Sequence, residues 1–263
     1  MARFIKNIGL RKGAKPGSLI FVGEQQTDRV VIRVMQYDTN SLEEQEVDTI
    51  DQALSLINDK SMTWINIFGI HDPEVMTTLG KRFDIDLLLL DDMMNTDHRP
   101  KLSIDDNHLY VITKLLNFNR ETGQIESDQL SLIAGKNFLV SLQEKPGTHF
   151  DAVRERIRKT RDRLRIIYSD YLDYAFLDCM VDSYLDLLAE IGSSIDNLEM
   201  EILEGKGKST SQKIYRQRTE LNFMRHVVLP LKELTFDLLK SDSLMIRKET
   251  SGFIKDLYDH VII

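Results

Sequence analysis

The sequence predicts an α+β protein in which a layered domain precedes a helical half. Short β-rich runs separated by Gly, Pro and Asn fill the first half, with helical patterns between several of them. From Asp151 to Ile263, only four glycines and Pro230 interrupt long stretches whose apolar residues recur with a helical period. Strands and helices mixed in one segment indicate a sheet covered by helices, and we expect this domain to take roughly 150 residues.

Six β-rich runs are expected to form the sheet. They span residues 18–22, 29–37, 62–68, 108–118, 129–134 and 138–142. Apolar spacing predicts a first helix over residues 48–56. Asp72 and Pro73 supply the N-cap and first-turn proline of a second helix, and a third is expected over residues 85–94.

The second half is predicted to form two long antiparallel helices. The first covers residues 168–204, a turn follows at residues 205–208, and Ser209 can cap a returning helix that runs towards Leu239. Pro230 removes one backbone hydrogen bond, so we expect a kink or break near Val228.

A last helix is expected to begin near Ser241 or Ser243 and to be still running at Ile263. No Gly, Asn or Pro closes it, so we expect the chain to be part of a larger protein. The predicted units are residues 1–166, 167–240 and 241–263.

Composition narrows the function. A net charge of -8 argues against a nucleic-acid binder and suits cations or basic partners. The single cysteine, Cys179, cannot form an intrachain disulfide, which fits a reducing compartment. No N-terminal signal peptide is apparent, and no run approaches the roughly 18 apolar residues that cross a bilayer. We expect the chain to be soluble and to lie on the cytosolic side of the membrane.

Acidic residues are the candidate ligands. Asp178, Asp182, Asp186 and Glu190 recur every four residues along one side of a helix. For this ridge we expect a solvated face or pairing with arginines, with a cation as the alternative at Asp178.

Two further groups of acidic residues are candidate cation ligands. Asp91 and Asp92 are neighbours after an apolar run, and they need a donor or a cation. Asp256, Asp259 and His260 share one face of the last helix. Zinc normally takes three or four His or Cys ligands, whereas carboxylates suit a hard cation such as Mg2+.

No catalytic constellation is found, and we expect no enzyme activity. Residues 205–208 lack phosphate-loop spacing, there is no Gly-x-Ser-x-Gly motif, and Cys179 lies in an apolar helical stretch. The basic residues between Arg154 and Arg165 are expected to form a solvated helix neutralised by nearby acids.

Several motifs together resemble the cytosolic part of the CorA magnesium and cobalt transporter family, over essentially the whole chain. They are Thr63-Trp64-Ile65-Asn66-Ile67 with Gly69-Ile70-His71, Leu90-Asp91-Asp92 with Asn95 and His98-Arg99-Pro100-Lys101, Gln143-Glu144-Lys145, Val153-Arg154-Glu155-Arg156-Ile157-Arg158, Pro230-Leu231-Lys232-Glu233, and Asp256-Leu257-Tyr258-Asp259-His260.

The resemblance implies an α/β/α layered domain with a mixed β-sheet, a long antiparallel helical hairpin, and the start of a stalk helix that leads into a transmembrane segment. It also implies a funnel-shaped homopentamer at the cytoplasmic face of the inner membrane, with no nucleic acid and no small-molecule substrate. Regulatory Mg2+, or Co2+, would bind between subunits, with Asp92 of one chain facing Asp256 of the next. A second ion would involve Asp91 and Asp178.

These implications describe a sensor. Acidic subunit edges repel one another and divalent cations relieve the repulsion, so bound Mg2+ would favour the closed pore. The family's Gly-Met-Asn pore signature would lie beyond Ile263. Two alternatives stay open, a ZntB-like zinc transporter domain and a free-standing soluble cation-binding regulator.

Overall fold

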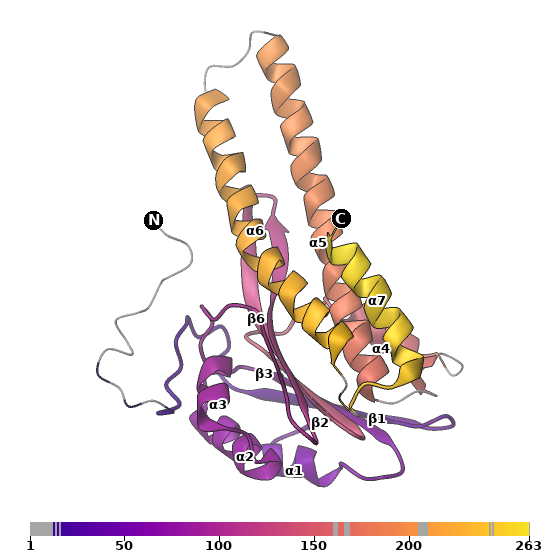
Figure 1. The fold of residues 1–263 in the computed structure, drawn as a ribbon. Helices are drawn as coiled ribbons and strands as arrows, with labels where there is room; N and C mark the ends of the chain where they lie inside the picture. The colour runs from indigo at the N-terminus through magenta and orange to yellow at the C-terminus, as the bar shows by residue number, and fades with distance from the viewer. Residues whose placement is uncertain are drawn as a thin grey trace.

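A seven-stranded mixed sheet forms the centre of the molecule (Figure 1). The structure is a computed structural model that describes residues 13, 15, 17–159, 163–165, 169–204, 210–241, 243 and 245–262. The strands are β1 (Val31–Tyr37), β2 (Leu42–Val47), β3 (Met62–Phe68), β4 (Lys101–Ile104), β5 (Leu109–Asn119), β6 (Gln124–Gly135) and β7 (Phe138–Gln143). Their order is β2-β1-β3-β7-β6-β5-β4, and only the β3–β7 pair is parallel.

Helices cover both faces of this sheet. One face carries α1 (Ile50–Ser55), α2 (Pro73–Phe83) and α3 (Leu87–Met93), and the other carries α4 (Asp151–Arg158), α5 (Ser169–Leu203), α6 (Thr210–Lys240) and α7 (Lys248–Ile262). Strand β3 is buried throughout because it lies between the layers. Its Trp64 packs with the second helix group, and Ile65 and Ile67 pack with the first, as the two-residue strand period requires.

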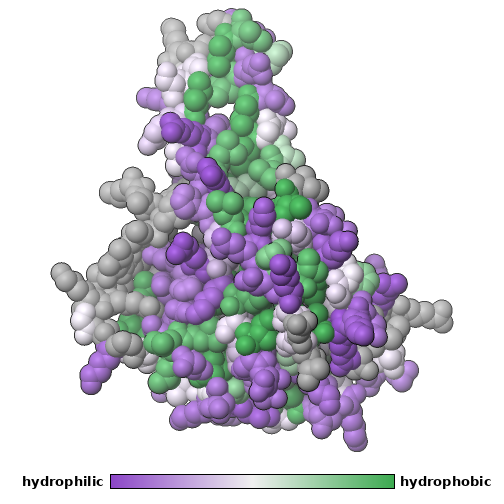
Figure 2. All heavy atoms as spheres, viewed as in Figure 1, coloured by the Kyte–Doolittle hydropathy of each residue, from purple (hydrophilic) through white to green (hydrophobic). Residues whose placement is uncertain are grey.

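The long helices α5 and α6 form a hairpin that projects past the sheet, and α7 lies beside α5 (Figure 1). Apolar side chains stay visible along the projecting part in the space-filling view (Figure 2). Helix α6 continues through Pro230 as one helix, so the alternative of a break near Val228 is wrong. The predicted turn at residues 205–208 and the Ser209 cap lie outside the described residues.

The predicted fold class is confirmed, with differences in individual elements. Residues 18–22 form no strand and contribute one bridge, Val22 to Asn95. The sequence pattern missed β2 and β4 as well as the first part of β6, which begins at Gln124. Helix α7 begins at Lys248, later than expected.

Among the helices in the part of the chain that the structure describes, none combines the length and apolarity needed to span a bilayer. The domain boundaries at residues 166 and 240 stay a prediction.

Candidate divalent-cation site

Helix α3 presents Asp91 and Asp92 at its C-terminal end. Asp86 caps the helix by accepting a hydrogen bond from the Leu88 amide, at 2.7 Å, and apolar residues of the helix are buried. Both carboxylates are half-buried in the last turn. Because the helix dipole is negative there, carboxylates at this end need a positive partner.

Asp92 has two such partners within the chain. Lys101 Nζ donates to Asp92 Oδ2 at 2.7 Å, and His98 Nε2 lies 3.3 Å from Asp92 Oδ1. The Asp92 side chain is 20% exposed, so this cluster stays open to solvent on one side. A cation that binds Asp92 must therefore compete with Lys101.

His98 completes this cluster. Its Nδ1 lies 2.7 Å from the carbonyl oxygen of Arg99, while its Nε2 faces Asp92, so only the imidazolium can donate to both. Burial lowers the pKa of His98, and the Asp92 charge opposes that change. With a neutral ring whose Nδ1 donates to Arg99, the Nε2 lone pair and Asp92 Oδ1 would both be available to a metal ion.

The other two predicted ligands lie at the contact between α5 and α7. Asp178 of α5 is half-buried and Asp256 of α7 has a side chain that is 63% exposed. Both charges act on Tyr174, which donates a hydrogen bond to Asp178 and has its pKa raised mainly by burial. His260 Nε2 lies 3.9 Å from Asp256 Oδ2.

Asp178 is the member of this second cluster whose pKa is raised. Burial raises its pKa first, and the neighbouring charge of Asp182 raises it further. The Tyr174 hydrogen bond and the nearby His260 and Arg156 oppose that rise. A bound cation would act in the same direction as these groups, because it favours the ionised carboxylate.

The structure thus places Asp178 on α5 and Asp256 on α7, where both charges act on Tyr174. It places Asp91 and Asp92 on α3, a helix of the opposite layer. Within the described ranges, no three or more His, Cys, Asp or Glu side chains gather closely enough to hold a metal. The four predicted ligands therefore form no site within one copy.

Beyond Asp178, the acidic ridge of α5 is exposed to solvent or paired with an arginine, as expected from the sequence. Asp182 and Asp186 are exposed to solvent, and Glu190 pairs with Arg120 from the β5–β6 turn. Sequence reasoning missed the roles of His98 and Lys101 beside Asp92. His98 and Lys101 follow Asp92 within nine positions, and this short separation was the signal available in the sequence. No sequence pattern indicated the turn that folds them back onto α3.

Comparison with known proteins places this architecture in a family. Residues 59–262 match the family model described as CorA-like Mg2+ transporter protein. The chain is 36% identical over 257 residues to the cobalt/magnesium transport protein CorA of Thermotoga maritima, which covers 98% of this chain and 73% of that protein. The chain belongs to the CorA-like Mg2+ transporter family.

Solved structures agree on the fold. The soluble domain of CorA from Methanocaldococcus jannaschii superposes with a TM-score of 0.68 at 17% identity, over 87% of this chain and 88% of that one. The ZntB cytoplasmic domain from Vibrio parahaemolyticus gives a TM-score of 0.61 at 13% identity, over 88% and 91%. Because both share the fold, the fold alone does not separate magnesium from zinc relatives.

Proposed function

We propose that this chain is the cytosolic metal-sensing and gating domain of a CorA-type Mg2+ transporter, in which Mg2+ binds between neighbouring copies and favours a closed pore. The observation that supports it is the separation of the four carboxylates into two pairs on opposite layers of one chain. Mg2+ takes one or two carboxylates and keeps several waters, so one carboxylate from each of two neighbouring copies suffices for a site.

Electrostatics supplies the switching force. Each copy carries a net charge of -8, so acidic edges that approach one another repel. A divalent cation between Asp92 of one copy and Asp256 of the next offsets that repulsion, and its loss lets the copies separate. A ligand can shift such an equilibrium only through its different affinity for the two states, which here comes from ligands contributed by two chains.

The proposal includes the rest of the assembly. The chain would act as a homopentamer at the cytoplasmic face of the inner membrane, attached through transmembrane helices that follow the α7 stalk. Mg2+ is the regulatory ion in this account, with Co2+ as the other ion, and no catalysis is involved.

Limited proteolysis with and without Mg2+ tests this function. Mg2+ should slow cleavage of the wild-type protein, and Asp92→Asn combined with Asp256→Asn should remove most of that protection. The control combines Asp186→Asn with Asp196→Asn, which removes the same charge from exposed positions of α5. Equal protection in both double variants would refute the site.

The zinc alternative rests on one specific observation. A histidine accompanies each acidic pair, His98 beside Asp92 and His260 beside Asp256, and imidazole suits Zn2+ better than Mg2+. Parallel proteolysis titrations with Mg2+ and Zn2+ separate the two. The zinc alternative is favoured if micromolar Zn2+ protects the wild-type protein and Mg2+ does not. The Zn2+ protection should then be lost in a His98→Gln variant.

A further inference from the structure

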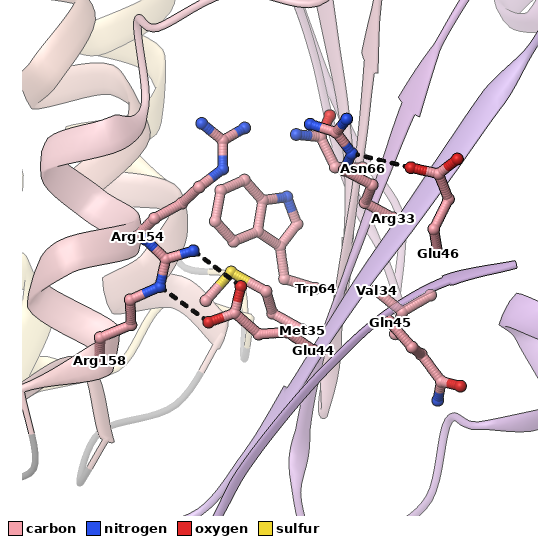
Figure 3. Close-up of a pocket in the computed structure, with 10 residues that line it drawn as sticks. All are labelled: Arg33, Val34, Met35, Glu44, Gln45, Glu46, Trp64, Asn66, Arg154 and Arg158. Atoms are coloured by element: carbon pink, nitrogen blue, oxygen red, sulfur yellow. Dashed lines mark hydrogen bonds and ion pairs between the residues drawn. The ribbon is translucent and has the colours of Figure 1, made fainter.

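A second polar site lies on the sheet face that carries α4, at the end formed by β1, β2 and β3 (Figure 3). It is a groove of about 340 Å³. The strand register places Arg33 of β1 between Glu46 of β2 and Asn66 of β3. Helix α4 adds Arg154 and Arg158 from the other side. Neither the carboxylates described above nor the proposed cation chemistry involves this groove.

The amide of Asn66 indicates what the groove accepts. Trp64 Nε1 donates to Ser141 Oγ at 2.8 Å, and Ser141 Oγ lies 3.1 Å from Asn66 Oδ1. An indole N–H can only donate, so the Ser141 hydroxyl accepts from Trp64 and uses its single hydrogen on Asn66 Oδ1. This relay fixes the Asn66 amide with its NH2 group at the free end.

That NH2 group is buried without a partner. Asn66 is 4% exposed, and its Nδ2 has no hydrogen-bond partner. A buried donor left unsatisfied costs roughly 1–3 kcal/mol, so an acceptor bound in the groove would stabilise this amide. In Figure 3 Trp64 lies between Arg154 on one side and the overlapping side chains of Asn66 and Arg33, which are register partners, on the other.

The guanidinium groups of Arg33 and Arg154 flank this donor, and each has N–H groups that are not used in the contacts described. Arg33 uses its Nε on Glu46 at 3.2 Å, and Arg154 uses Nη1 on Asp151 at 2.6 Å while its guanidinium lies 5.1 Å from the centre of the Trp64 ring. A guanidinium has five N–H donors, so most of them remain on each residue.

Arg158 differs from these two arginines. It forms a bidentate pair with Glu44, at 2.8 Å for both contacts, and donates to Glu155 at 2.7 Å. Arg158 therefore closes the rim of the groove, and the two groove glutamates, Glu44 and Glu46, are both occupied by arginines.

We propose that this groove binds a small oxyanion, a carboxylate or a phosphate, through Asn66 Nδ2 and the guanidinium groups of Arg33 and Arg154. The ligand supplies the acceptor that the Asn66 amide lacks, and it accepts from the guanidinium N–H groups that Glu46 and Asp151 leave unused. Proteins commonly bind such anions through charge-assisted hydrogen bonds from planar guanidinium groups.

Tryptophan fluorescence tests the site directly, because Trp64 lines the groove and is the only tryptophan of the chain. Inorganic phosphate and succinate are titrated separately, with ionic strength held constant by NaCl. A saturable change with phosphate alone identifies a phosphate ligand, a change with succinate alone identifies a carboxylate, and a change with both identifies a general oxyanion site. Each supports the proposal, whereas no saturable change with either anion would overturn it.

Two variants locate the response. Arg33→Gln should weaken binding roughly tenfold or more, because it removes a charged donor. Arg120→Gln is the matched control, since Arg120 also pairs with one glutamate, and its binding should equal that of the wild type. Equal affinities in the Arg33→Gln variant and the wild type would overturn the proposal.

Discussion

At the scale of single residues, Lys101 competes with any cation for Asp92, because its ammonium already lies 2.7 Å from Asp92 Oδ2. Lys101→Gln removes that competitor and leaves Asp92 in place. We expect Mg2+ affinity, measured by isothermal titration calorimetry, to rise several-fold. Lys145→Gln, which removes the lysine paired with Asp128 at 3.1 Å, is the control and should leave affinity unchanged. A fall in affinity after Lys101→Gln would show that Lys101 supports the site.

Asp173 gives a residue-scale prediction about pH. Complete burial raises its pKa well above the usual 3.8, and the neighbouring Asp170 raises it further. The folded state therefore holds a proton that the unfolded state has released, so this group's contribution to stability falls as pH rises above 3.8 towards the folded pKa.

Asp173→Asn removes this titration and keeps the shape of the side chain. Urea unfolding at several pH values should show that the variant gains stability over the wild type as pH rises, by at most about 1.4 kcal/mol per pH unit. Parallel curves for the two proteins would contradict a protonated Asp173.

At the scale of elements, Glu220 fastens α6 to the sheet. Its buried carboxylate accepts a hydrogen bond from the backbone N–H of Ile125 in β6, at 2.8 Å. Glu220→Ala leaves that N–H without its partner, and we expect a loss of roughly 1–3 kcal/mol in the free energy of unfolding. Chemical denaturation measures it, with Glu199→Ala at an exposed α5 position as the control. A loss no larger than that of the control would contradict this role.

Elements with strong local signals were predictable, and elements defined by their neighbours were not. Strand β3 coincides with its predicted range, and Asp72 and Pro73 start α2 as expected. Strand β2 reads Leu-Glu-Glu-Gln-Glu-Val, which has no apolar alternation, and it exists because it pairs with β1 at the sheet edge. Strand β4 has only four residues.

The start of α7 is likewise set by a neighbouring element and not by local sequence. The backbone N–H of Arg247 donates at 3.0 Å to Asp170 Oδ2, on α5 and 77 positions away in the sequence. A tertiary contact of this kind fixes where the helix begins, and no local pattern near Ser241 or Ser243 could reveal it.

At the scale of the whole molecule, the sequence motifs predicted which carboxylates matter, and the fold determines how they can meet. Asp178 and Asp256 share one surface, and Asp91 and Asp92 lie across the sheet from it. The pairing between copies follows from the family resemblance and stays a prediction, because one chain carries no information about a partner's position.

Cross-linking between copies tests the central claim most directly. In a Cys179→Ser background, Leu88→Cys and Asp259→Cys are combined in one chain and treated with a short thiol cross-linker in the presence of Mg2+. These exposed positions lie about one helical turn from Asp92 and Asp256 and leave both carboxylates in place. Helices α3 and α7 belong to opposite layers of each copy, so a link between the two positions must join two chains. The account predicts a ladder of covalent multimers, and a control that pairs Leu88→Cys with Asp196→Cys should stay monomeric. Monomers alone from the Leu88 and Asp259 pair would contradict a cation site shared between neighbouring copies.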